Sequence, residues 1–149
     1  MTEQQKLKDL KKAIRESSPT SNVYVGCDSK RTPSGVVKYA TVVILHIDGK
    51  HGGKMWSFIS KEMDYGSIKN PKMRLIREAY KAVEIAAQIV DDVGERNFEV
   101  HLDLNSNPEY KSNSVVKEAL GYVMGVLGFS AKIKPHAWAS SSAADKLTQ

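Results

Sequence analysis

The chain has 149 residues, of which 41% are hydrophobic and 26% are charged, and its formal net charge is +5. This composition is typical of one globular domain and excludes a disordered chain, a coiled coil or a collagen-like repeat. The longest apolar run, at 41–45, is far shorter than the roughly 18 residues of a membrane span, and no secretory leader opens the chain. The single cysteine, Cys27, cannot form an internal disulfide, so we expect a cytoplasmic protein.

The first element is a basic helix over residues 6–16. Leu7, Leu10 and Ile14 recur at helical spacing on one face, and lysines and Arg15 occupy the other. Ser17-Ser18-Pro19 ends this helix, because proline disfavours helical geometry in the residue before it. We therefore divide the chain into a basic N-terminal helix with a short linker, residues 1–19, and a domain of residues 20–149.

Three strands follow, joined by short turns. The apolar and β-branched runs at 23–27, 37–47 and 55–60 predict them, with a turn at 29–36 and a glycine-rich hairpin loop at 48–53. The first strand is expected to end at Asp28. Short connections between consecutive strands indicate antiparallel pairing.

The second half alternates helices and strands. Asn70-Pro71 marks the start of a helix over 72–93 that Gly94 stops, and Ser114 can cap a helix that Gly128 ends after Leu127. Strands are expected at 98–104 and 131–134, and a last short helix from Ser141 or Ser142 to Leu147. The predicted fold is α/β: a mixed five-stranded sheet, three antiparallel strands and then parallel ones, with helices on both faces.

Four carboxylates fall at places where a solvated surface residue is not expected. Asp28 ends an apolar strand, Asp103 interrupts an apolar strand, Glu78 lies beside the apolar face of the long helix, and Asp145 lies on the last helix. A carboxylate near a core is costly unless it is paired or bound to a metal. If the first and fourth strands are parallel neighbours, Asp28 and Asp103 meet at the carboxyl edge of the sheet.

Each carboxylate also has a simpler interpretation. Asp28 can close a turn with Ser29, Asp103 can bond the following loop, Glu78 can pair with Arg74 one turn earlier, and Asp145 can be exposed on its helix. Together they suggest a site for hard cations, Mg²⁺ or Mn²⁺, because such ions prefer carboxylate oxygens and bridge to phosphates. Two such ions can activate a water and stabilise the leaving oxygen of a phosphodiester.

The element order and three motifs resemble the ribonuclease H-like superfamily, and more closely its YkuK-type bacterial family. The motifs are Val23-Tyr-Val-Gly-Cys-Asp28-Ser-Lys, His101-Leu-Asp103-Leu-Asn-Ser-Asn107 and Lys134-Pro-His136-Ala-Trp-Ala-Ser, and the resemblance covers residues 20–149. It implies that Asp28, Glu78, Asp103 and Asp145 hold two divalent ions. Glu78 lies deeper in its helix than the helix-start glutamate of the superfamily, and Glu84 is the weaker alternative.

The remaining signals concern histidines, cations and the partner. His101 shares a strand face with Asp103, so it can orient a ligand, shuttle a proton, or be a buried histidine with satisfied bonds; His136 can approach the same edge. Zinc is disfavoured, because Cys27 and the histidines lack ligand spacing. Basic residues in or beside loops can contact phosphates: Lys30, Arg31, Lys69, Lys72 and Arg74.

The favoured function is a magnesium- or manganese-dependent nuclease that acts on RNA, DNA or their hybrid. The alternative is a binding module for nucleic acid or protein that has the same fold and no catalysis.

Overall fold

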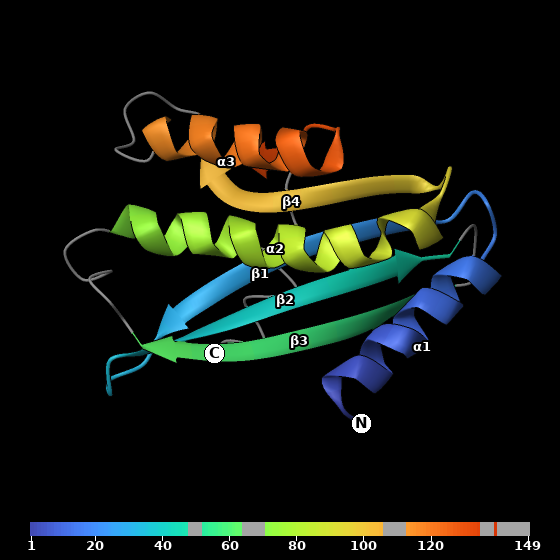
Figure 1. Ribbon diagram of the computed structural model, residues 1–149, viewed down its shortest axis with the longest axis horizontal. Coiled ribbons are helices and arrows are strands. Elements are labelled where there is room, and N and C mark those ends of the chain that lie inside the picture. The colour runs from blue at the N-terminus through green and yellow to red at the C-terminus, as the bar shows by residue number, and fades with distance from the viewer. Residues whose placement is uncertain (48–51, 64–70, 106–112, 135–138, 140–149) are drawn as a thin grey trace.

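The computed structural model describes residues 1–47, 52–63, 71–105, 113–134 and 139. Its helices and strands follow the predicted order (Figure 1). They are α1 (Glu3–Glu16), β1 (Asn22–Arg31), β2 (Val36–His46), β3 (Gly53–Met63), α2 (Pro71–Val93), β4 (Asn97–Asn105), α3 (Asn113–Leu127) and β5 (Lys132–Lys134). Gly94 and Gly128, which follow α2 and α3, have positive φ angles of 56° and 82°, the conformation in which glycine ends a helix.

The strands form one mixed sheet in the order β3-β2-β1-β4-β5. β2 pairs antiparallel with both β1 and β3, whereas β4 pairs parallel with both β1 and β5. This confirms the predicted five-stranded mixed sheet. It also makes β1 and β4 parallel neighbours at the centre, which is the arrangement needed to bring their carboxyl ends to one edge.

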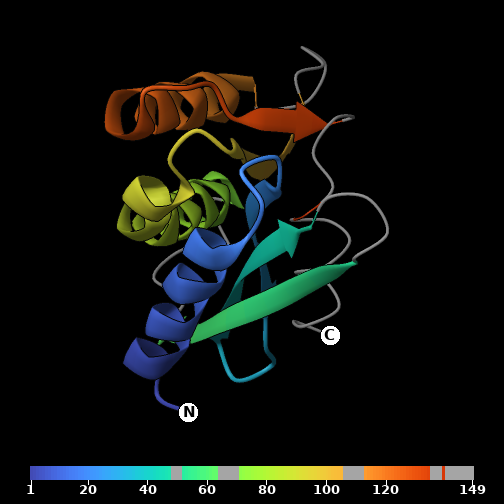
Figure 2. The same ribbon diagram turned by 90° about the vertical axis from the view of Figure 1, so that its right-hand side faces the viewer.

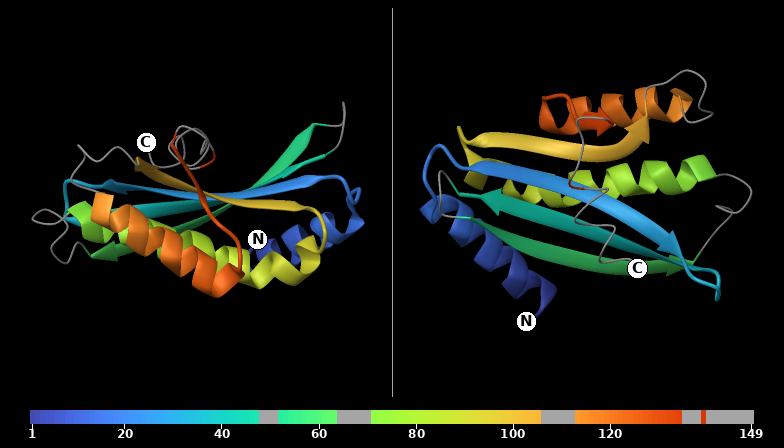
Figure 3. Two further views of the ribbon diagram at one scale, coloured as in Figure 1. Left: turned by 90° about the horizontal axis from the view of Figure 1, so that it is seen from above. Right: turned by 180° about the vertical axis from the view of Figure 1, so that it is seen from behind.

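The three described helices lie on the same face of the sheet (Figure 3, left; Figure 2). The prediction placed helices on both faces, whereas the described helices cover one face; the last predicted helix, at 141–147, lies outside the described part of the chain. None of the helices in the described ranges is long and apolar enough to cross a membrane.

The core lies between the helices and the sheet, and the sequence alternation decides which side chains enter it. Val23, Val25 and Cys27 of β1 are buried there, as are Val100 and Leu102 of β4. Because side chains alternate along a strand, the even-numbered positions of β1 and the odd-numbered positions of β4 face the other side of the sheet. This alternation assigns Asp28, His101 and Asp103 to the face opposite the helices.

Helix α1 is part of the same packing. Its Leu10 and Ile14 are fully buried in the core. Thr2 and Gln5 form a capping box at its start, and Asp9 accepts a 3.0 Å hydrogen bond from the indole N–H of Trp56 on β3. Figure 2 shows α1 beside β3. The boundary at residue 19 remains a prediction.

Strand β1 is longer than expected. The prediction ended it at Asp28 and gave 29–36 to a turn, but β1 continues to Arg31 because Ser29, Lys30 and Arg31 pair with residues 37–39 of β2. Asp28 therefore lies inside the antiparallel ladder, opposite Ala40. The predicted end of the strand at Asp28 was therefore wrong for the pairing with β2. The parallel pairing with β4 stops earlier, at Gly26 and His101.

Candidate metal centre

Asp28 and Asp103 are brought together by the register of the two central strands. The parallel pairing of β1 with β4 runs from Asn22 opposite Asn97 to Gly26 opposite His101. Asp28 lies two residues beyond Gly26, and Asp103 lies two residues beyond His101, so each is the next side chain on that face. Both aspartates follow the last parallel pair of β1 and β4, at the carboxyl edge where such sheets bind their ligands.

Glu78 reaches the two aspartates from α2, on the helix side of the sheet, at the point beyond the last parallel pair of β1 and β4. It is 5% exposed, and it continues the buried stripe that Ala82, Ile89 and Val93 form along this helix. These residues follow Glu78 by four, eleven and fifteen positions, which is close to one, three and four turns of an α-helix, so all four lie on one face. Glu78 therefore occupies a core position, although the sequence placed it beside the apolar face.

The three carboxylates are close enough to share an ion. One oxygen each of Asp28, Glu78 and Asp103 can be chosen so that all lie within 4.8 Å of one another. Asp28 and Glu78 are buried and Asp103 is half-buried. A set of ligands made only of carboxylate oxygens fits Mg²⁺ or Mn²⁺ and offers no nitrogen or sulfur for zinc or copper.

The pKa of Glu78 reflects both its burial and its charged neighbours. Burial raises the pKa of Glu78 well above its usual range, and the nearby charges of Asp28 and Asp103 raise it further. Two effects oppose this rise in pKa: the Ser29 hydroxyl donates a 2.8 Å hydrogen bond to Glu78 Oε2, and Arg74 adds an attraction. A divalent cation among the three carboxylates would offset the same repulsion.

Ser29 is a site residue whose role the sequence analysis missed. It was considered as a turn partner of Asp28, but it lies in β1, where the alternation from Val25 and Cys27 turns its side chain toward α2. Its hydroxyl orients one oxygen of Glu78. The signal that could have found it is this period of two, continued past the assumed end of the strand.

Cys27 lies beside the cluster but does not belong to the ligand set. It is 2% exposed, and burial together with the charge of Glu78 raises the pKa of its thiol far above the usual range. A neutral thiol is a poor metal ligand, because cysteine binds metals as the thiolate. Cys27 is therefore a core residue here.

His101 is a buried histidine with both ring nitrogens hydrogen-bonded. The backbone N–H of Ala139 donates to its Nδ1 at 3.1 Å, so the ring proton must be on Nε2, which donates to Glu99 Oε1 at 3.1 Å. Burial lowers the pKa of His101, although Glu99 acts in the opposite direction. Of the three roles considered, this geometry matches the buried histidine and leaves neither nitrogen for a metal or a proton relay.

The other predicted site residues fall into two groups. Glu84, the alternative to Glu78, is exposed on α2 and is not in the carboxylate cluster. Asp145 and His136 lie outside the described residues, so their part in the site stays a prediction.

Comparison with known proteins agrees with the architecture. A family model described as "Ribonuclease H-like" matches residues 5–149, which is nearly the whole chain and includes most of α1. A search of curated proteins found no match, and a search of solved structures found none. The sheet order, the parallel β1–β4 pair and the family match together show that the chain belongs to the ribonuclease H-like family.

Proposed function

We propose that this protein is a divalent-metal-dependent nuclease that hydrolyses phosphodiester bonds of nucleic acids. The observation that carries the proposal is the meeting of Asp28, Glu78 and Asp103 within 4.8 Å of one another. Three partly or fully buried carboxylates repel one another, and such a cluster is costly without a cation. Its position beyond the last parallel pair of the two central strands of a ribonuclease H-like sheet is best explained by metal binding.

Each residue of the proposed site has its own role. Asp28 and Asp103 would hold Mg²⁺ or Mn²⁺ from the two strands, and Glu78 would hold it from α2, with Ser29 orienting one Glu78 oxygen. The ions would supply an activated water and stabilise the leaving oxygen. The strands and the long helix keep the carboxylates in place, because rigid elements position a site better than loops. Asp145 remains our proposed fourth ligand.

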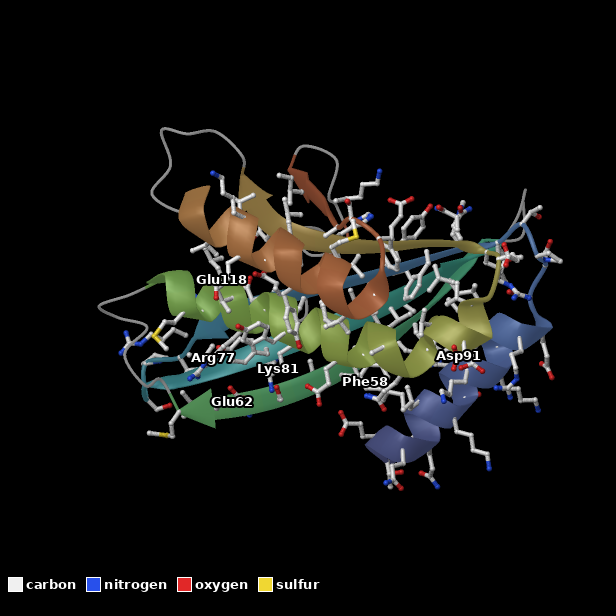
Figure 4. All side chains as sticks on the ribbon, turned by 45° about the horizontal axis from the view of Figure 1, so that its top comes forward. Phe58, Glu62, Arg77, Lys81, Asp91 and Glu118 are labelled. Carbon is white, nitrogen blue, oxygen red and sulfur yellow. The ribbon has the colours of Figure 1, made fainter. Side chains whose placement is uncertain are left out.

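The test is a cleavage assay with labelled single-stranded RNA, single-stranded DNA and a hybrid duplex, each with Mg²⁺, Mn²⁺ or EDTA. We expect cleavage that requires metal and is lost in Asp28→Asn and Asp103→Asn. The matched control is Asp91→Asn, because Asp91 is exposed near the other end of α2 (Figure 4). Thirteen residues separate it from Glu78, about 20 Å along the helix.

The outcomes separate the two candidate functions. Wild-type protein that binds nucleic acid but never cuts it, with both variants binding equally well, would favour the non-catalytic module. Cleavage that persists in both aspartate variants would show that the cluster is not the active site. Loss of cleavage in Asp91→Asn as well would point to a general loss of folding, which circular dichroism would detect.

A further inference from the structure

Three lysines stand in one row across neighbouring strands. Lys30 of β1 is directly opposite Lys38 of β2, and Lys38 is directly opposite Lys61 of β3. Lys30 and Lys61 are exposed, and Lys38 is half-buried. Lys30 was expected in or beside a loop, and no sequence motif marks Lys38 or Lys61. We name these residues the lysine row.

The lysine row lies on the face of the sheet opposite the helices. Lys38 stands between Val37 and Tyr39, which are both buried in the core under the helices, so its own side chain is on the other face. On β3, Glu62 forms ion pairs with Arg77 and Lys81 of α2 (Figure 4). Lys61, the residue before it, therefore faces away from α2.

Asp28 is in the adjacent row of this face. It precedes Lys30 by two residues on β1, so the two rows are about 7 Å apart along the strand. Figure 3 (right) shows this face, with the ends of β1 and β3 on either side of the start of β2. The lysine row and the carboxylate cluster are therefore neighbours at one end of the sheet.

Like charges placed directly opposite one another destabilise a sheet. The row places three lysines at directly opposed positions of β1, β2 and β3. Lysines gathered in this way can bind a polyanion, because its phosphates attract all three ammonium groups and binding releases counterions.

We propose that the lysine row binds the phosphate backbone of a nucleic-acid strand and guides it to the carboxylate cluster. The inference rests on the proposed function for the identity of the substrate. Strands in a sheet are about 4.8 Å apart, so the row spans about 10 Å. A strand of duplex carries one phosphate per about 3.4 Å, so two or three phosphates fit along the row. The long lysine stems let each ammonium adjust to its phosphate.

The experiment compares two triple variants that each remove three positive charges. One is K30Q/K38Q/K61Q, and the matched control is K8Q/K12Q/K117Q, whose lysines are exposed on α1 and α3. Binding of short fluorescein-labelled single-stranded RNA and DNA is measured by anisotropy in EDTA, from about 50 to 200 mM salt. EDTA keeps the measurement independent of metal binding and cleavage.

We expect the slope of log K against log salt to fall by about 2 in the lysine-row variant, at about 0.7 per lost contact with a single strand. The Kd at about 0.1 M salt should rise by roughly two orders of magnitude, while the control changes little. K30R/K38R/K61R should bind like the wild type, because arginine keeps the charge. If the triple variant does not fold, K30Q/K61Q changes only the exposed lysines and should lower the slope by about 1.4.

Equal affinity in the lysine-row variant and its control would overturn the inference and leave the nuclease proposal standing. Absence of binding by the wild type to both RNA and DNA would also overturn it. A lysine-row effect on binding in a protein that never cuts nucleic acid would support the inference and refute only the proposed catalysis.

Discussion

Replacement of Asp28 by asparagine should change stability in opposite directions with and without metal. At 4.8 Å, two unit charges repel by about 3.5 kcal/mol at an effective dielectric constant of about 20. Asp28→Asn removes two of the three pairwise repulsions while nearly conserving side-chain volume. Proton uptake by Glu78 already relieves part of the repulsion, so we expect a gain of about 1–3 kcal/mol in the free energy of unfolding.

The gain should appear only in the metal-free protein. In a domain of this size, each kcal/mol raises Tm by roughly 2–4 °C. A cation at about 100 times its Kd stabilises the wild type by about 2.7 kcal/mol, and the variant should lose most of this effect. In EDTA the variant should therefore melt above the wild type, and in saturating Mn²⁺ the wild type should equal or exceed the variant.

The assay is thermal melting followed by circular dichroism, in EDTA and in a Mn²⁺ titration, with Asp91→Asn as the control on the exposed side of α2. The control should melt like the wild type under both conditions. A variant less stable than the wild type in EDTA would refute the reasoning, because it would mean that the Asp28 carboxylate makes a net stabilising interaction in the metal-free protein. So would a wild type whose Tm does not respond to Mn²⁺ or Mg²⁺.

Three further predictions concern single residues. Burial raises the pKa of Glu78 in the folded, metal-free protein above its value of about 4.3 in the unfolded chain. The folded protein therefore gains stability from protonated Glu78 below about pH 4.3, and it loses this stability as the pH rises through the pKa of the folded state. Urea melts at several pH values should show this loss, and Glu78→Gln should make the free energy of unfolding less dependent on pH. Cys27 should react with a thiol reagent only on unfolding, because its thiol is buried and neutral; rapid reaction of native protein would contradict the packing. Arg96→Ala should lower the free energy of unfolding by about 2–3 kcal/mol in denaturant melts, because the Arg96 guanidinium donates hydrogen bonds to Ser17 Oγ and to the carbonyls of Ser17 and Ser18. The control Lys8→Ala, at an exposed site, should leave the free energy of unfolding unchanged.

The order of helices and strands could be predicted from the sequence because each signal is local. Apolar alternation marks β1 and β4, helical spacing marks α1 and α2, and Gly94 and Gly128 end helices through conformations that other residues rarely adopt. The ends of these elements depend on tertiary pairing as well as on the local sequence. β1 continued to Arg31 because pairing with β2 holds residues that read locally as a turn.

Asp28 and Asp103 could also be recognised in the sequence, since Asp28 follows an apolar run and Asp103 interrupts an apolar strand. Their proximity followed once β1 and β4 were assumed to be parallel neighbours. That adjacency is a property of the whole sheet, but the order of elements made it the natural arrangement.

Only the tertiary structure decided the roles of Glu78, His101 and the lysine row. Whether Glu78 or Glu84 meets the aspartates depends on how α2 is rotated against the sheet, which its own sequence leaves open. The two hydrogen bonds of His101 involve Glu99, two residues away, and Ala139, which is distant in sequence. Lys30, Lys38 and Lys61 become neighbours only through the register of three strands, because a shift of one residue would turn a strand's side chains to the other face.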